Sequence, residues 1–426
     1  MTTLTDGNRL KAIFAASAGN LVEWYDFYVY AFTALYFSSQ FFPESDPLVQ
    51  IMATSGIFAA GFFMRPVGGW FFGRYADRHG RRASMVLAVM LMGAGSLLIA
   101  CLPTYGSIGV LAPALLLVGR MIQGFSTGGE YGTAATYMSE IAAPGKRGFW
   151  ASFQYVTLIG GQLCATLVIL ILQQLLSDEA MSGYGWRIPF LIGAVAAAGV
   201  LVLRRGLHET AEGGERHVDV GSLTALFRQN GRAFATVVAL TAGGSLAFYT
   251  FTTYMQKYLV LTVGLSKETA TALMTGVLIV FMALQPLMGL LSDRIGRRNN
   301  IILFAGLASL FTVPILSVLA ETGSTTVAFL LVLAGLTINS FYTSVGGLFK
   351  AEMFPIHLRA LGVGLSYGVG NALFGGTAEN IALFFKQAGY ESGFYWYVTA
   401  ICVVSLLAAL TLKDTREDNI LDNVRV

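Results

Sequence analysis

A charged block of ten residues occurs twice in this sequence, as GRYADRHGRR at 73–82 and as GLLSDRIGRR at 289–298. The two copies are separated by half of the chain. A second pair of similar segments, SEIAAPGKRG at 139–148 and AEMFPIHLRA at 351–360, has nearly the same separation. Two repeats at one separation indicate that the chain consists of two homologous halves.

The composition places these halves in a lipid bilayer. Hydrophobic residues make up 55% of the chain and charged residues only 12%, whereas a soluble domain carries roughly 25% charged residues. Twelve apolar runs are long enough for a membrane-crossing helix: 12–37, 50–72, 84–104, 110–138, 149–175, 187–204, 233–260, 269–291, 300–320, 325–349, 360–385 and 393–412. We therefore predict an all-α membrane protein with twelve transmembrane helices in two pseudo-symmetric six-helix bundles, as in transporters built from two parallel repeats.

The polar interval between the sixth and seventh runs divides the chain. We predict an N-terminal bundle at 1–204, a cytoplasmic linker at 205–232 and a C-terminal bundle at 233–426. If the N-terminus is inside, all but six of the 27 Lys and Arg residues fall in cytoplasmic segments. Lys350 is among the residues assigned to these cytoplasmic segments. The six exceptions are Arg187, Lys257, Lys267 and Lys386 at the opposite face, and Arg65 and Arg120 within spans. This bias predicts that both termini are cytoplasmic.

Few ionisable residues lie well inside the apolar runs: Glu23, Asp26, Arg65, Arg120, Glu130 and Glu379. Each costs at least ~2.5 kcal/mol on insertion scales, so it faces a cavity or a partner. Small residues follow Arg65 in RPVGG (65–69) and leave room beside it. Because the guanidinium fork matches a carboxylate, Arg65 and Arg120 are candidate binding groups for a dicarboxylate. The alternative is that both arginines form fixed ion pairs that only hold helices together.

Proton coupling must use carboxylates if it exists. All four histidines, His79, His208, His217 and His357, lie outside the apolar runs. Burial away from water favours the neutral form of a carboxyl group, which allows it to take up a proton. Glu23, Asp26 and Glu130 are therefore the candidate coupling residues. Glu23 and Asp26 are three residues apart and share a helix face.

Uncharged polar residues in the remaining spans supply further candidate contacts. Tyr249 and Gln256 lie in the seventh run, Asn371 in the eleventh, and Tyr155 and Gln162 in the fifth. These side chains could line a site for a small solute. The alternative is that they form hydrogen bonds between helices.

Other functional classes find no support in the sequence. It has no G-x-x-x-x-G-K-[ST] block for ATP phosphates, and Cys101, Cys164 and Cys402 have neither metal-ligand nor disulfide spacing. The net charge of +3 reflects membrane topology and not nucleic-acid binding. We expect transport driven by an ion gradient, with no enzymatic activity, no cofactor and no metal.

Several segments carry a family resemblance. The two charged blocks and RMIQG at 120–124 resemble the loop and helix-4 motifs of the major facilitator superfamily. GNLVEWYDFYVY (19–30), GGEYGTAATYMSE (128–140) and FKAEMFPIHLRALGVGLSYGVGNALFGG (349–376) resemble its metabolite:H+ symporter branch. ASFQYVTLIGGQL (151–163) and AFYTFTTYMQKYLV (247–260) are similar to the α-ketoglutarate carriers of that branch.

The resemblance implies a carrier that imports α-ketoglutarate with protons across the bacterial inner membrane by alternating access. We expect it to be a monomer surrounded by lipid. The repeated charged segments are assigned to a cytoplasmic gate, with the residues Asp77, Arg78, Arg81, Asp293, Arg294, Glu140, Arg147, Glu352 and Arg359. The second block has Leu290 and Leu291 where the first has Arg74 and Tyr75, so we expect the two copies to contribute unequally.

Other transport functions remain open on the sequence alone. A symporter of the same branch could carry citrate, shikimate or a zwitterionic osmolyte. A drug:proton antiporter shares the fold. A channel is the alternative from another class, although two-fold repeats with buried charges favour a carrier.

Overall fold

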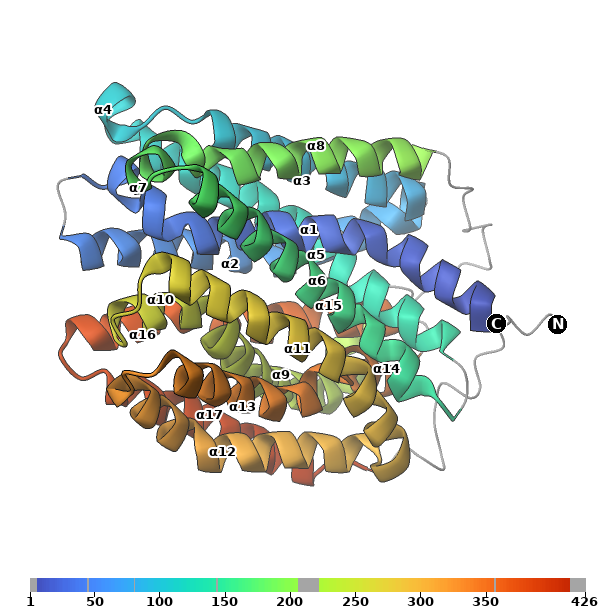
Figure 1. The fold of residues 1–426 in the computed structure, drawn as a ribbon. Coiled ribbons are helices and arrows are strands. Elements are labelled where there is room, and N and C mark those ends of the chain that lie inside the picture. The colour runs from blue at the N-terminus through green and yellow to red at the C-terminus, as the bar shows by residue number, and fades with distance from the viewer. Residues whose placement is uncertain are drawn as a thin grey trace.

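The computed structural model describes residues 6–43, 46–79, 81–142, 145–205, 222–355 and 358–413, and these ranges contain helices and no strand. The first half consists of α1 (Asp6–Phe41), α2 (Pro47–His79), α3 (Arg81–Cys101), α4 (Tyr105–Ile108), α5 (Leu111–Ile141), α6 (Arg147–Leu175), α7 (Asp178–Ala180), the π-helical turn η1 (Met181–Gly185) and α8 (Arg187–Arg205). Figure 1 shows these helices, coloured blue to green, side by side with the second half.

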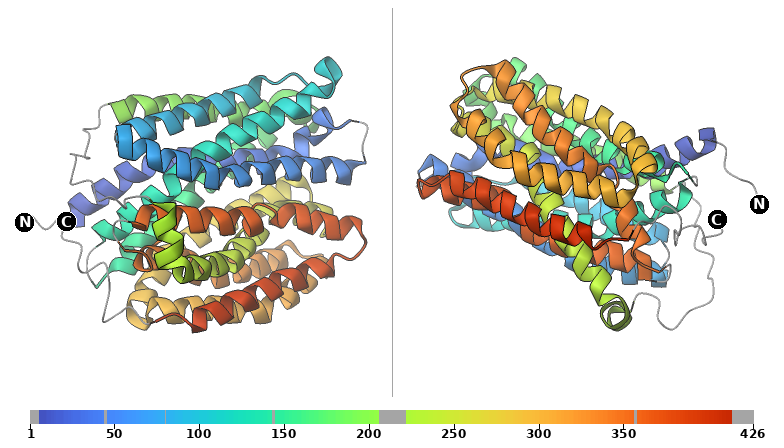
Figure 2. Two further views of the ribbon diagram at one scale, coloured as in Figure 1. Left: turned by 180° about the vertical axis from the view of Figure 1, so that it is seen from behind. Right: turned by 90° about the horizontal axis from the view of Figure 1, so that it is seen from below.

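The second half has the same number of long spans, but three of them are interrupted. It consists of α9 (Leu223–Tyr249), the π-helical turn η2 (Thr250–Tyr254), α10 (Met255–Leu261), α11 (Lys267–Ile295), α12 (Arg297–Glu321), α13 (Thr325–Thr343), α14 (Gly346–Glu352), α15 (Arg359–Gly370), the π-helical turn η4 (Asn371–Gly375), α16 (Ala378–Gln387) and α17 (Ser392–Leu410). The left view in Figure 2 shows the same separation into halves from behind. Each of the twelve predicted spans is occupied by a long helix or by consecutive helices.

Only some helices of this bundle are apolar enough to be recognised as membrane spans, because polar residues interrupt the others. Within the described residues, seven helices are long and apolar enough to cross a membrane by length and composition alone, or eight if α7, η1 and α8 form one broken span. The helices α1 and α5 are not among them. Both carry ionisable residues, Asp26 and Arg120, in the middle of their apolar runs.

Small residues bring α2 and α5 into backbone contact. A side chain at Gly124 or Gly128 of α5 would overlap the backbone carbonyl of Gly61 or Arg65 of α2, respectively. Close packing through small residues is the usual way in which helices associate in lipid. The contact places Gly61, one turn before Arg65 in α2, against the backbone of Arg120.

The two halves touch at both ends of the bundle. We call the end with residues 73–82 and 289–298 the motif end, and the opposite one the far end. At the motif end, α6 and α11 are in backbone contact at Gly148 and Gly289. At the far end, Lys257 of α10 donates a hydrogen bond of 2.7 Å to the carbonyl oxygen of Ala31 in α1. The two halves are therefore in contact at both ends.

The structure corrects the expected positions of two lysines. Lys257 and Lys350, assigned above to opposite aqueous faces, are both fully buried, and both lie within apolar spans. Each lies near the end of an apolar run, where a basic residue is normally taken to lie in the aqueous segment next to the membrane. The helix α9 begins at Leu223, inside the range expected to be linker, and has a non-helical break at Asn230.

Candidate functional site

Two buried arginines contact the same aromatic ring. Arg65 of α2 is 2% exposed and Arg120 of α5 is 0% exposed. Their Cζ atoms lie 4.3 and 4.5 Å from the centroid of the Phe27 ring in α1. We call these three residues the arginine site. Aromatic faces attract guanidinium groups, which explains how two like charges are held in one region.

Most nitrogens of these guanidinium groups have no protein acceptor. In the described chain, Nε, Nη1 and Nη2 of Arg65 and Nε and Nη2 of Arg120 have no hydrogen-bond partner. The remaining nitrogen, Nη1 of Arg120, donates to Oε1 of Gln123 at 2.7 Å. Buried charged groups are normally paired or hydrogen-bonded. The described residues therefore do not form the fixed ion pairs considered as an alternative, and the site has donors to offer a ligand.

Tyr249 extends the arginine site to the C-terminal half. Its ring lies 5.1 Å from the ring of Phe62, which in turn lies 4.1 Å from Cζ of Arg65. Tyr249 also interacts electrostatically with Arg120. Its hydroxyl is near that of Tyr28 in α1. Tyr249 therefore lies beside the arginine site.

A second tyrosine cluster adjoins the site. The rings of Tyr131 in α5 and Tyr367 in α15 are stacked, with centroids 3.5 Å apart. The Tyr155 hydroxyl is near that of Tyr131. Asn371 donates from Nδ2 to the Tyr367 hydroxyl at 3.1 Å. Its Oδ1 atom accepts no hydrogen bond from the described residues. Tyr155 and Asn371 therefore belong to the surroundings of the site.

The two predicted glutamines differ in their environment. Gln162 is fully buried in α6, and neither of its amide atoms has a hydrogen-bond partner in the described chain. Gln256 donates to the hydroxyl of Thr271 in α11 at 3.0 Å. Gln173 of α6 donates to the same hydroxyl at 3.2 Å. The hydrogen bond of Gln256 thus lies within the C-terminal half, beside the contact between the halves that Gln173 makes, and it is not with the arginine site.

The helix-1 carboxylates face the interior of the N-terminal half. Asp26 is fully buried, and its polar neighbours are the hydroxyl of Ser96 and the guanidinium of Arg120. Glu23 is 5% exposed and borders a small cavity that is also lined by Val89 and Ala197. Arg120 interacts electrostatically with both Asp26 and Arg65. It therefore links the buried carboxylate to the arginine site.

The second charged block forms a buried network at the motif end. Asp293 accepts hydrogen bonds from the backbone N–H groups of Gly148 at 2.7 Å and Phe149 at 3.0 Å, at the first turn of α6. Arg297 forms ion pairs with Asp293 at 3.2 Å and with Glu352 at 3.5 Å. Arg297 is absent from the predicted gate, although it occupies the position in its block that Arg81 occupies in the first. Comparing the two copies residue by residue would have identified it.

The side chains of only some of the other predicted gate residues are described by the structure. Arg147 and Arg359 are buried, and Arg359 donates from Nε to the carbonyl oxygens of Ala351 at 3.1 Å and Phe354 at 3.2 Å. Arg294 is exposed at the end of α11. The side chains of Asp77, Arg78, Arg81, Glu130 and Glu140 lie outside the part of the chain whose side chains are described.

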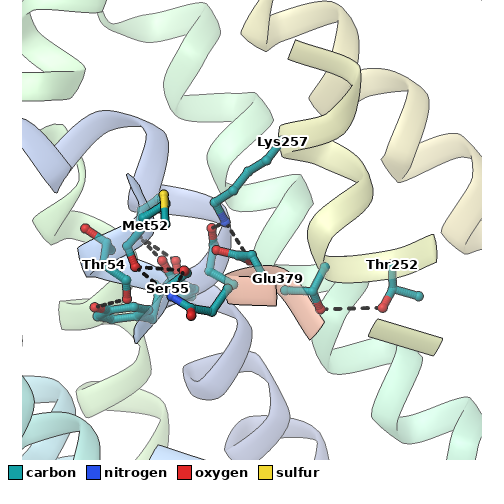
Figure 3. A network of polar contacts seen from close by, with 12 residues as sticks. Met52, Thr54, Ser55, Thr252, Lys257 and Glu379 are labelled. Carbon is teal, nitrogen blue, oxygen red and sulfur yellow. Dashed lines mark hydrogen bonds and ion pairs between the residues drawn. The ribbon is translucent and has the colours of Figure 1, made fainter. Parts of the chain in front are cut away.

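A buried ion pair that the sequence analysis missed lies at the far end. Nζ of Lys257 is 3.0 Å from Oε2 of Glu379 in α16. Beside it, Nδ2 of Asn380 donates to the carbonyl oxygen of Met52 and to the hydroxyl of Ser55, both at 3.1 Å and both in α2 (Figure 3). Together with the bond to Ala31, these contacts join the two halves at the far end.

Comparison with known proteins identifies the family. A model for sugar and other transporters matches residues 11–212, and a model for the major facilitator superfamily matches residues 245–423. The alpha-ketoglutarate permease of Escherichia coli (strain K12) is 57% identical over 413 residues, which cover 97% of this chain and 95% of that protein. The chain belongs to the major facilitator superfamily. A citrate-proton symporter of Salmonella typhi is 34% identical, over 95% of this chain and 94% of that protein.

The fold of this major facilitator protein agrees with a solved relative. The structure of a proton:xylose symporter bound to 6-bromo-6-deoxy-D-glucose superimposes with a TM-score of 0.79, at 17% identity, over 97% of this chain and 98% of that one. The predicted two-bundle membrane fold and the predicted family are confirmed. The chain is a multi-pass membrane transporter and not an enzyme.

Asp293→Asn is expected to weaken closure of this major facilitator protein at the motif end. The change removes the charge from an acceptor of two backbone N–H groups across the halves, and hydrogen bonds to charged groups contribute about 1.5–3 kcal/mol each. We expect faster hydrogen exchange at the amides of Gly148 and Phe149 and at least a roughly tenfold slower substrate exchange, because ~1.4 kcal/mol corresponds to tenfold. Glu321→Gln, which removes an exposed carboxylate at the far end, is the control. Unchanged exchange at both amides would contradict the gating role.

Proposed function

We propose that this chain takes up α-ketoglutarate together with protons. The observation that supports this most directly is the arginine site, in which five guanidinium nitrogens of Arg65 and Arg120 are buried without a protein acceptor. Such donors match the oxygens of a carboxylate ligand. The identity of 57% to an alpha-ketoglutarate permease supports the choice of this dicarboxylate.

Electrostatics explains why protons would accompany the substrate. A dianion that enters a cell with a negative interior is opposed by about 2.3 kcal/mol per charge for each 100 mV. Cotransport of two or more protons removes this opposition. Asp26, buried and next to Arg120, supplies a carboxyl group for at least one of them.

We also propose an orientation in the bacterial inner membrane. The motif end and both termini face the cytoplasm, because basic residues concentrate in the segments at that end. One chain supplies the arginine site from its N-terminal half and the surrounding tyrosines from both halves, so a monomer suffices for transport.

The proposal is tested by uptake into proteoliposomes. With an acidic exterior, purified full-length protein should accumulate labelled α-ketoglutarate, and a protonophore should abolish the accumulation. Unlabelled citrate, shikimate and betaine are added as competitors. Uptake that does not respond to the pH gradient would contradict proton symport. If citrate competes better than unlabelled α-ketoglutarate at equal concentration, the substrate assignment is wrong.

A further inference from the structure

Lys350 lies in an aromatic cage to which the described residues contribute no carboxylate. It belongs to α14 and is fully buried. Its Nζ atom lies 4.6 to 5.5 Å from the ring centroids of Tyr367, Phe349, Tyr342 and Tyr131. The one hydrogen bond it makes within the described chain goes to the hydroxyl of Tyr131, at 3.2 Å. Among the residues whose side chains are described, the neighbours of this ammonium group are all neutral.

Lys257 is a second buried lysine, and its partners provide a comparison for Lys350. Lys257 is also fully buried, but it is paired with Glu379 at 3.0 Å and bonded to the carbonyl oxygen of Ala31 at 2.7 Å. A buried charge in a membrane protein normally has such a partner. The contrast indicates that none of the described residues is the counter-ion of Lys350 and points to a ligand in that role.

The position of Lys350 relates it to the arginine site. Tyr131 belongs to the N-terminal half and Tyr367 to the C-terminal half, and their rings are stacked. Arg65 interacts electrostatically with both tyrosines, and Lys350 contacts both. The stacked pair is therefore flanked by one cation from each half of the molecule.

We propose that Lys350 binds the carboxylate of the substrate that is distal to the keto group, while Arg65 binds the carboxylate next to the keto group. This assignment rests on the proposed function in that it requires a dicarboxylate. Aromatic rings hold the ammonium in place through cation–π attraction, and they leave its N–H donors for a carboxylate. A dicarboxylate would then connect the halves through Arg65 of α2 and Lys350 of α14, whereas a monocarboxylate would engage one cation only.

The test compares two ligands that differ in one carboxylate. Binding of α-ketoglutarate and of 2-oxopentanoate, which has the same chain length without the distal carboxylate, is measured on purified full-length protein by titration calorimetry. Lys350→Gln should weaken α-ketoglutarate binding by about 10–100-fold, the range expected for hydrogen bonds to a charged group. Its affinity for 2-oxopentanoate should change by less than threefold. Lys350→Arg should retain part of the preference for the dicarboxylate.

Controls separate binding from a structural role. Lys386→Gln neutralises a lysine at the far end that is paired with Glu391, and it should leave the preference for the dicarboxylate intact. Because Lys350→Gln removes a buried charge without a counter-ion, its melting temperature should be equal to or above that of the wild type. Loss of folding, equal weakening of both ligands, or unchanged affinity for α-ketoglutarate would each overturn the assignment. Wild-type protein that does not bind α-ketoglutarate would instead contradict the proposed function.

Discussion

Replacing Arg65 with lysine is expected to reduce α-ketoglutarate binding by about 10–100-fold, although the charge is kept. Lysine presents a compact ammonium and loses the planar fork that donates two parallel hydrogen bonds to a carboxylate. It also loses the flat surface that contacts Trp24, Phe27 and Phe62 at 5.0, 4.3 and 4.1 Å. Equilibrium binding measured on purified protein gives the change directly.

The matched control for Arg65→Lys is Arg187→Lys. Arg187 also lies over a tryptophan ring, with its Cζ 4.3 Å from the centroid of Trp186. Its Nη1 atom donates to the carbonyl oxygens of Ala100 and Leu102 at 2.9 and 2.6 Å, so its role is to fix the end of α3. Arg187→Lys should therefore affect stability and leave binding within about threefold of the wild type. A threefold change is smaller than the tenfold change that corresponds to ~1.4 kcal/mol. Equal affinities in Arg65→Lys and wild-type protein would remove Arg65 from the binding site.

The sequence was sufficient to find the charged residues in the middle of the apolar runs. Arg65, Arg120 and Asp26 interrupt apolar runs, and the structure buries all three in one region. Helical spacing placed Glu23 and Asp26 on a common face, and both face the interior of the N-terminal half. Their neighbours on α3 and α8 could not be predicted, because that contact depends on how distant helices pack.

The two buried lysines show where sequence reasoning failed. Lys257 and Lys350 lie near the ends of apolar runs, where a basic residue usually marks the aqueous face. Their burial depends on partners far away in the chain. Glu379 of α16 pairs with Lys257, and Tyr131 of α5 and Tyr367 of α15 enclose Lys350. Only the three-dimensional arrangement distinguishes these two buried lysines from basic residues that lie at an aqueous face of the membrane.

Asp26→Asn is expected to abolish proton-driven accumulation of substrate while counterflow exchange continues. Asp26 is fully buried, and the cation among its polar neighbours is Arg120, which also interacts with Arg65 of the arginine site. A substrate carboxylate that binds Arg120 reduces its attraction for Asp26. Loss of a nearby positive charge favours the neutral carboxylic acid, so substrate binding and proton uptake become linked. Exchange of one substrate for another needs no net proton movement and does not depend on this linkage.

Glu379→Gln provides the contrast, because it neutralises a second buried carboxylate that has a fixed partner. Removing Glu379 leaves Lys257 buried and unpaired, which typically costs about 3–5 kcal/mol of stability. We expect a lower melting temperature and a parallel loss of accumulation and counterflow. Asp26→Asn should separate these two activities and keep its thermal stability. If Asp26→Asn and Glu23→Gln both accumulate α-ketoglutarate with the pH dependence of the wild type, coupling does not involve α1. Glu130, on the same helix as Arg120, would then be the residue to test, because the same exchange of Arg120 between a carboxylate and the substrate could operate along α5.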